Sequence, residues 1–220
     1  MLQTDAILGI CGILGGLFTA AGDMLLDIKG KDNVSTGKYG FLDSAWDHMD
    51  IRRFRLSILL AMIGVPLIFL GMTAMARQLM LAAPVFGKVF YYVSMVGTTG
   101  GFFIHTIICL FPIIYKTMRK KYSFDEAETV INAVYESIRI PFWLQYMALV
   151  AVPALMIIYA LFAGYLNLSR LYVLLTAPVL VGVSILLAKI KRDWFCDLPF
   201  AISPSLSMSM IGLLALLNTM

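Results

Sequence analysis

Ionisable side chains are scarce in the apolar segments of this chain, and the first of them are two aspartates near the end of the first segment. Asp23 and Asp27 are four residues apart, so in a helix both side chains lie on the same face. An ionised carboxylate near a helix C-terminus meets the partial negative charge of the helix dipole, so Asp23 needs a partner. The nearest basic residues in the sequence are Arg52, Arg53 and Arg55. We favour a structural ion pair between these two segments.

His105 is the one histidine within an apolar segment, and Thr98, Thr99 and Thr106 lie close to it in the sequence. Hydroxyl groups or backbone carbonyls can satisfy a neutral imidazole, which favours a buried structural histidine. The alternative is that His105 relays protons or contacts a ligand, because ionisable groups inside a membrane often mark such paths.

A third polar group surrounds the start of the last apolar segment, where Asp197 is followed by Ser203 and Ser207. The two serines share a helical face, and free amides at a helix N-terminus favour anions or carbonyl groups. Serine hydroxyls that bond back to their own helix explain the same residues equally well. The sequence thus predicts a ligand-binding site that opens inward, with these candidate residues: Asp23, Arg52, Arg55, His105, Gln145, Asp197, Ser203 and Ser207.

Motifs for catalysis or metal binding do not accompany these residues. The 2 histidines are His48 and His105, and His48 belongs to a hydrophilic loop, which argues against a three-histidine zinc site and a bis-histidine haem site. The charged loop from Asp43 to Asp50 matches no defined spacing of ligands. We therefore expect no metal and no cofactor, and the sequence favours a role other than catalysis.

The composition indicates that lipid is the solvent for most of the chain. Of 220 residues, 60% are hydrophobic and 14% are charged, too little polar surface for a water-soluble globule. Apolar runs of about 20 residues predict helices, because backbone amides in hydrocarbon must be paired within their own segment. We expect one all-α membrane domain over residues 1–220. Its six transmembrane helices are predicted at about Ala6–Leu26, Leu56–Ala76, Val89–Tyr115, Pro141–Ala163, Leu171–Ile190 and Pro199–Met220.

Basic residues alternate between the gaps that separate these six segments. Of the 17 lysines and arginines, six lie in the first gap or at its edges, five in the third and three in the fifth. The second gap holds two and the fourth holds one. The positive-inside rule then places the richer gaps in the cytoplasm and both termini outside. A sequence pI of about 9.0 follows from this orientation and from contact with anionic lipid, so we expect no nucleic-acid partner.

An amphipathic helix is predicted in the cytoplasm over residues 124–139. Ser123 and Glu126 have the spacing of a capping box, and Pro141 predicts that the helix ends just before it. One face is apolar and the other is acidic, with Glu128 and Glu136 among its members. An acidic face suits the protein's own cytoplasmic rim or a partner better than an anionic lipid surface.

Glycine and proline spacing suggests how the segments pack. Gly12 with Gly16, and Gly97 with Gly101, form pairs of small residues that let two backbones approach, within the bundle or at a homodimer seam. Pro66 and Pro178 lie in the middle of the second and fifth segments, a pattern found in transporters with inverted repeats.

Short segments also carry a family resemblance: Gly22-Asp23-Met24-Leu25-Leu26-Asp27, Arg52-Arg53-Phe54-Arg55, Ile63-Gly64-Val65-Pro66 and Ile202-Ser203-Pro204-Ser205. In these segments the chain resembles an uncharacterised family of bacterial multi-pass membrane proteins. The resemblance implies residence in a bacterial inner membrane and assigns no activity to any residue.

Three kinds of function remain open. The first, which we favour, is a binding or transport-like bundle for a small amphiphilic ligand. The second is a membrane-embedded enzyme that acts on a lipid or isoprenoid at the cytoplasmic leaflet, with Asp23 or Asp197 as the base. The third is a structural or assembly subunit that docks a cytoplasmic or membrane partner through the acidic helix face.

Overall fold

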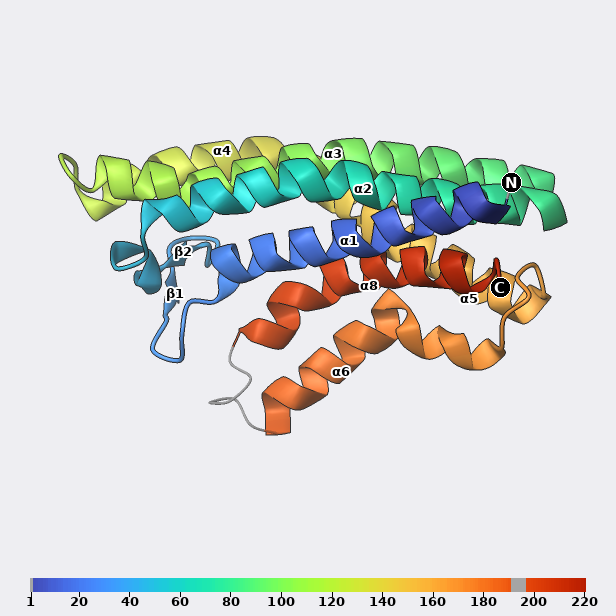
Figure 1. The fold of residues 1–220 in the computed structure, drawn as a ribbon. Coiled ribbons are helices and arrows are strands. Elements are labelled where there is room, and N and C mark those ends of the chain that lie inside the picture. Colours follow the sequence, from blue (N-terminus) through green and yellow to red (C-terminus); the bar gives the residue numbers. More distant parts are fainter. Residues whose placement is uncertain (1, 191–196) are drawn as a thin grey trace.

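The chain folds into a bundle of long helices, shown by a computed structural model that describes residues 2–190 and 197–220 (Figure 1). The all-α fold expected from the sequence is confirmed. The helices are α1 (Leu2–Asp27), α2 (Ile51–Ala82), α3 (Pro84–Met118), α4 (Phe124–Tyr146), α5 (Val152–Ala163), α6 (Ala177–Ile190) and α8 (Leu198–Leu217). A two-stranded antiparallel hairpin, β1 (Ser35–Thr36) with β2 (Leu42–Asp43), lies between α1 and α2.

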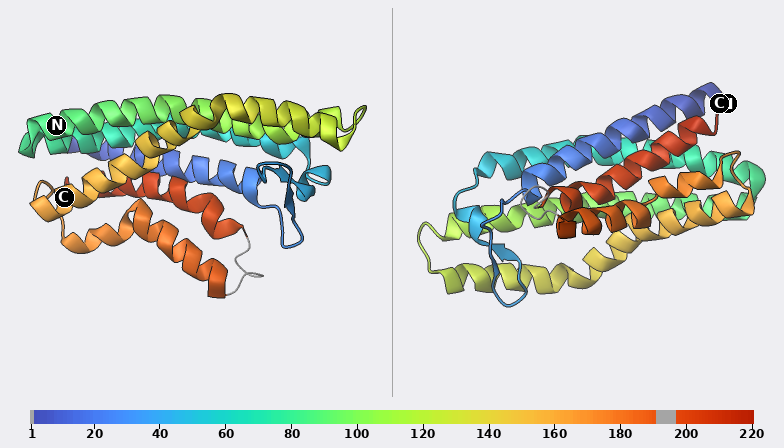
Figure 2. Two further views of the ribbon diagram at one scale, coloured as in Figure 1. Left: turned by 180° about the vertical axis from the view of Figure 1, so that it is seen from behind. Right: turned by 90° about the horizontal axis from the view of Figure 1, so that it is seen from below.

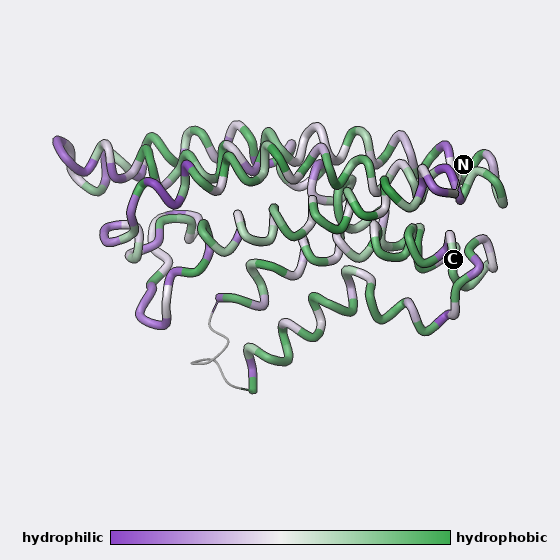
Figure 3. Tube along the Cα trace, viewed as in Figure 1, coloured by the Kyte–Doolittle hydropathy of each residue, from purple (hydrophilic) through white to green (hydrophobic). Residues whose placement is uncertain are grey.

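Five of these helical segments are long and apolar enough to cross a membrane. They correspond to the predicted first, second, third, fourth and sixth spans. The helix α3 has 35 residues and measures about 52 Å at ~1.5 Å per residue, more than a hydrocarbon core of about 30 Å. Hydrophobic residues run along the helices, and hydrophilic residues gather at the ends of the bundle (Figure 3).

The prediction of a continuous fifth helix over Leu171–Ile190 is wrong. The segment begins with a 3₁₀ turn, η3 (Arg170–Leu175), and Thr176 is extended before α6 starts. Pro178 therefore lies in the first turn of a helix, where its missing amide hydrogen costs nothing. Pro66 lies inside α2, so the two prolines are not equivalent and the inverted repeat loses its support.

The predicted helix end before Pro141 is also wrong. Pro141 lies inside α4, which continues through the π-helical turn η2 (Met147–Ala151) into α5. Packing outweighs the local effect of proline here, because residues on both sides of Pro141 are buried, Ile131 at 0% and Val150 at 6% exposure. The helix ends at Ala163, where Gly164 adopts a left-handed conformation with φ of 72°.

Glycines allow α1 to lie between α2 and α8. A Cβ atom on Gly12 would lie 2.6 Å from the Cα of Gly71 on α2 and 3.1 Å from the Cα of Gly212 on α8. On α3, a Cβ atom on Gly97 would lie 2.6 Å from the carbonyl oxygen of Ala148 in η2. Both predicted glycine pairs therefore contact helices of the same chain, which removes the reason to assign them to a homodimer seam.

The described ends of the chain lie together at one end of the bundle (Figures 1 and 2). At this end the Asn218 side chain donates to Gln78 and accepts from the backbone amide of Asn167, and Gln78 donates to the carbonyl of Ala215. The β hairpin and the α3–α4 turn lie at the opposite end (Figure 1). The first and third gaps, which are rich in basic residues, therefore share one end.

The N-terminal half of α4 packs on the protein itself. The capping box between Ser123 and Glu126 is present as predicted. Glu128 accepts from the backbone amide of Lys38, and Glu136 accepts from the hydroxyl of Tyr39, both in the hairpin. The acidic face of α4 thus holds the tip of the hairpin.

Candidate functional site

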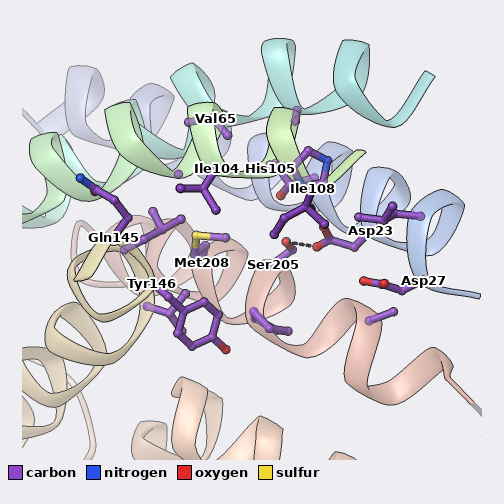
Figure 4. A pocket seen from close by; sticks show the side chains of 18 of the residues that line it. Asp23, Asp27, Val65, Ile104, His105, Ile108, Gln145, Tyr146, Ser205 and Met208 are labelled. Atoms are coloured by element: carbon purple, nitrogen blue, oxygen red, sulfur yellow. Dashed lines mark hydrogen bonds and ion pairs between the residues drawn. The ribbon is translucent and has the colours of Figure 1, made fainter. Parts of the chain in front are cut away.

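A cavity of about 220 Å³ lies among α1, α2, α3, α8 and the α4–η2 segment (Figure 4). Its walls are mostly apolar, and its polar groups gather mainly toward the hairpin end, where Asp23, Asp27 and His105 lie. The lining residues are Thr19, Asp23, Leu26, Asp27, Ala61, Val65, Gly101, Ile104, His105, Ile108, Phe142, Gln145, Tyr146, Leu149, Val150, Phe200, Ala201, Pro204, Ser205 and Met208.

Asp23 on α1 contacts two other helices at the polar end of the cavity. Its Oδ1 atom lies 3.5 Å from Nδ1 of His105 on α3, and its Oδ2 atom accepts a hydrogen bond from Ser205 on α8. The side chains of Asp23 and His105 are 16% and 17% exposed, so both are mostly shielded while still reaching the cavity. Three helices therefore meet at one carboxylate.

The partner predicted for Asp23 was wrong. Arg53 instead donates to the carbonyls of Leu25 and Ile28, at 3.1 and 2.9 Å. Carbonyls in the last turn of a helix have no intrahelical partner, and a guanidinium with several N–H groups satisfies them well. Arg53 therefore caps the C-terminus of α1, and His105 is the ionisable partner of Asp23 instead.

The second nitrogen of His105 is held by Ser57 on α2. Nε2 lies 3.0 Å from the Ser57 hydroxyl oxygen, and that hydroxyl donates to the carbonyl of Gly22 at 2.8 Å. Because a carbonyl can only accept, the one Ser57 proton is used there, and His105 must donate from Nε2. Cys109 also donates to the Ser57 oxygen. These hydrogen bonds therefore fix the orientation of the His105 ring and assign its proton to Nε2.

Gln145 lies on the opposite wall, just before the π-helical turn. Its Oε1 atom is buried without a hydrogen-bond partner among the described residues. A Cβ atom on Gly100 would lie 1.9 Å from the Gln145 side chain, so this glycine makes room for the amide. Wide π-helical turns recur at functional sites, and here Leu149 and Val150 of the turn line the cavity.

Asp27 lines the cavity, its side chain is 42% exposed, and it has a basic neighbour outside the helix. Lys29 Nζ is 3.5 Å from Asp27 and 2.8 Å from Asp43 in β2. Burial by itself would lower the pKa of Lys29, but the two carboxylates, Asp27 foremost, hold that pKa above its usual value. The ammonium of Lys29 therefore compensates the charges of the loop.

The other predicted site residues do not line this cavity. Arg52 and Arg55 are exposed at the start of α2. Asp197 accepts from the backbone amides of Lys29 and Gly30 and so docks the start of α8 on the α1–α2 loop. Ser203 is 3% exposed and lies outside the lining. Ser207 bonds back to the carbonyl of Pro204 and lines a separate small cavity.

Of the eight predicted residues, the structure therefore brings together Asp23, His105 and Gln145. Sequence reasoning missed Ser57 and Ser205, the two hydroxyl groups that bond to this site. Ser205 lies between Ser203 and Ser207 in the sequence, on a different face of α8. Only the rotation of α8 about its own axis decides which face meets Asp23, and no local signal reports that rotation.

The contacts from Ser57 through His105 to Asp23 have the order of a hydrolytic triad, but the hydroxyl is placed differently. Ser57 is fully buried and does not line the cavity, and its proton points to the Gly22 carbonyl. A nucleophile needs its proton directed at the base and its oxygen open to substrate. Within the described residues, no group of three or more His, Cys, Asp or Glu side chains is placed to hold a metal ion.

Comparison with known proteins identifies a family and no individual relative. A search of curated proteins and a search of solved structures each found no match. One family model, described as "Family of unknown function (DUF6796)", matches residues 2–220. The match covers nearly the whole chain and agrees with the uncharacterised family that the sequence resembles. The chain belongs to this family of unknown function.

Proposed function

We propose that the chain is a membrane protein whose helical bundle binds a small amphiphilic molecule in the cavity beside Asp23. The observation that carries this proposal is the combination of apolar walls with polar groups concentrated at one end. An amphiphile places its hydrocarbon part against Ile104, Val150 and Met208 and its polar group beside Asp23 and His105.

The size of the cavity supports a ligand of modest dimensions. An apolar cavity of about 150 Å³ in another protein binds benzene, so about 220 Å³ suits a molecule somewhat larger than benzene.

Six crossings account for the path of the chain. Five helical segments are long enough to span a bilayer, but two chain ends on the same side require an even number. The remaining segment joins η3 to α6, and its six and 14 residues measure about 33 Å at ~2.0 and ~1.5 Å per residue. That length matches a hydrocarbon core of about 30 Å, so we take residues 170–190 as the sixth crossing.

The charge distribution orients the bundle. The hairpin end carries the gaps rich in lysine and arginine, so by the positive-inside rule it faces the cytoplasm and both termini lie outside. A bacterial inner membrane is the setting that the resemblance of the sequence implies. Asp23 and Asp27 then lie toward the cytoplasmic side, and the cavity opens inward.

The rival functions have weaker structural support. As an enzyme, the chain would need Asp23 or Asp197 as a base, but Asp197 is engaged by the amides of Lys29 and Gly30. As an assembly subunit, it would use the acidic face of α4, but Glu128 and Glu136 already hold the hairpin. The amphiphile-binding bundle uses a mostly apolar cavity of about 220 Å³ with ionisable groups at one end.

Binding of the neutral fluorescent amphiphile N-phenyl-1-naphthylamine to the purified protein in lipid nanodiscs tests this proposal. We expect saturable fluorescence enhancement above that of empty nanodiscs. The Ala201→Phe variant fills the cavity, because Ala201 is buried in its wall. Its affinity for the probe should be at least tenfold weaker than that of the wild type.

Ala21→Phe is the matched control, since Ala21 is exposed on α1 and lies outside the lining. It should bind like the wild type. Equal binding by Ala201→Phe and Ala21→Phe, with both folded by circular dichroism, would show that the probe sits in lipid and that the proposal is wrong.

A further inference from the structure

We propose that the natural ligand is a lipophilic organic cation, such as an ammonium, and that its binding displaces one proton held between Asp23 and His105. This inference rests on the proposed function and specifies the chemistry of the same cavity. It is drawn from the hydrogen bonds around the two side chains and from the charges that face them.

The first step is the proton count on the imidazole. The Ser57 hydroxyl donates its hydrogen bond to the Gly22 carbonyl, so the hydrogen bond at Nε2 of His105 uses the ring's own proton. In a neutral imidazole with its proton on Nε2, Nδ1 carries a lone pair. That lone pair faces Oδ1 of Asp23 at 3.5 Å.

The second step follows from this arrangement. A lone pair and an ionised carboxylate repel each other, and 3.5 Å leaves no room for a water between them. The contact is favourable only when one proton lies between Nδ1 and Oδ1, as a carboxylic acid beside imidazole or as a carboxylate beside imidazolium. In both forms the pair is electrically neutral and binds one exchangeable proton.

The third step concerns the charges that face the pair from each neighbouring helix. On α1 and its loop, Asp27 lies 3.5 Å from the ammonium of Lys29, which also contacts Asp43 at 2.8 Å. From α3, α4 and α8 the nearest titratable or polar groups are Cys109, Tyr146 and Ser205. In the described part of the chain, the lining contains no lysine or arginine. Once the pair loses its proton, the carboxylate of Asp23 therefore favours a cation in the cavity.

The remaining lining suits the rest of such a ligand. Phe142, Tyr146 and Phe200 present aromatic rings to the cavity, and aromatic faces attract ammonium groups. Gln145 adds a buried carbonyl oxygen without a partner, which can accept from an N–H group. An anionic headgroup would find no lysine or arginine among the described lining residues, so a phosphate or sulfonate amphiphile is disfavoured.

The exchange is balanced in charge. The empty site contains a neutral Asp23–His105 pair with one shared proton. When the cation enters, that proton leaves to water past the partly exposed Asp27, and the site holds an Asp23 carboxylate, a neutral His105 and one positive ligand. No covalent bond other than those to the proton changes.

Benzyltrimethylammonium and its uncharged carbon isostere, neopentylbenzene, test the inference on the intact protein in nanodiscs. They have the same shape and differ by one charge. Displacement of N-phenyl-1-naphthylamine measures binding, and a pH-indicator dye in weakly buffered solution measures protons. We expect the ammonium to release about one proton per bound molecule near neutral pH, and neopentylbenzene to release none.

Asp23→Asn supplies the matched variant. It should retain neopentylbenzene binding, weaken benzyltrimethylammonium binding at least tenfold and abolish proton release. Binding of neopentylbenzene with no binding of the ammonium, or ammonium binding without proton release, would overturn the inference and leave the proposed function standing. Failure of both compounds and of the fluorescent probe would overturn the proposed function itself.

Discussion

His105 on α3 faces Asp23 on α1 at 3.5 Å, and this contact joins helices that are far apart in the sequence. Ser57 on α2 holds the other nitrogen of the ring, and Ser205 on α8 holds the other oxygen of the carboxylate. The polar end of the cavity is thus assembled from four helices, and its properties depend on all of them.

Replacing Ser57 with alanine should destabilise the protein by about 1–3 kcal/mol, because the buried Nε2–H of His105 loses its acceptor. Thermal unfolding in detergent measures this loss. The freed ring should also shift the pH at which benzyltrimethylammonium binding displaces the proton from the Asp23–His105 pair. Ser209→Ala is the control, since that hydroxyl donates to the Ile13 carbonyl between α1 and α8. It should cost about 0.5–1.5 kcal/mol and leave proton release unchanged. Identical proton release in both variants would contradict the role given to Ser57.

Adding one methyl group at Gly16 should separate α1 from α8. The new Cβ atom would lie 2.5 Å from the backbone nitrogen of Ser209, and backbone cannot move aside as a flexible side chain can. We expect Gly16→Ala to destabilise the bundle by about 1–3 kcal/mol, measured by unfolding in increasing SDS. Gly182→Ala on α6 meets nothing within 4 Å and should be neutral or stabilising by up to about 1 kcal/mol. Equal losses in the two variants would refute the close approach.

Aromatic contacts should contribute more than the exposed Lys38–Glu136 pair to holding the hairpin on α4. The ring centroid of Tyr135 lies 4.1 Å from that of Phe41 and 5.2 Å from that of Tyr39. The Lys38–Glu136 pair is 63% and 50% exposed, and exposed ion pairs contribute little. Tyr135→Ala should therefore speed trypsin cleavage after Lys38 severalfold, with gel electrophoresis as the readout. Glu136→Gln should cleave at nearly the wild-type rate, and the reverse order would show that charge dominates.

The orientation predicts which loops are accessible from outside the cell. In a cysteine-free background, Lys31→Cys at the hairpin end and Asn167→Cys between α5 and η3 place single thiols at exposed positions. A membrane-impermeant maleimide added to intact cells should label Asn167→Cys and spare Lys31→Cys until the cells are opened. Labelling of Lys31→Cys in intact cells would invert the orientation and place the mouth of the cavity outside.

Features that depend on neighbours in the sequence were predicted correctly. The capping box at Ser123 needs only a residue three positions on, and the apolar runs that form α1, α2, α3 and α8 need only their own composition. Gly12 and Gly97 also indicated close packing, because the absence of a side chain lets the backbone of a neighbouring helix approach, whichever helix that is. These are local properties, and a sequence states them directly.

Proline was the point at which local reasoning failed. Pro141 predicted the end of a helix, but buried contacts on both sides carry α4 through it. Pro178 was placed in the middle of a helix, but it lies in the first turn of α6. The cost of a proline in a helix is about 3 kcal/mol, an amount that tertiary packing of two or three buried side chains offsets.

The sequence by itself determined the class of protein, an all-α chain with segments that suit a bilayer. It also identified Asp23, His105 and Gln145 as candidate ligand-binding residues. Only the tertiary structure decided that these three line one cavity, that Arg53 caps α1 instead of pairing with Asp23, and that Ser205 is the serine of α8 that reaches the site. The reason is geometric. Composition and periodicity depend on residues a few positions apart, whereas the partner of a side chain depends on how whole helices rotate and slide against one another.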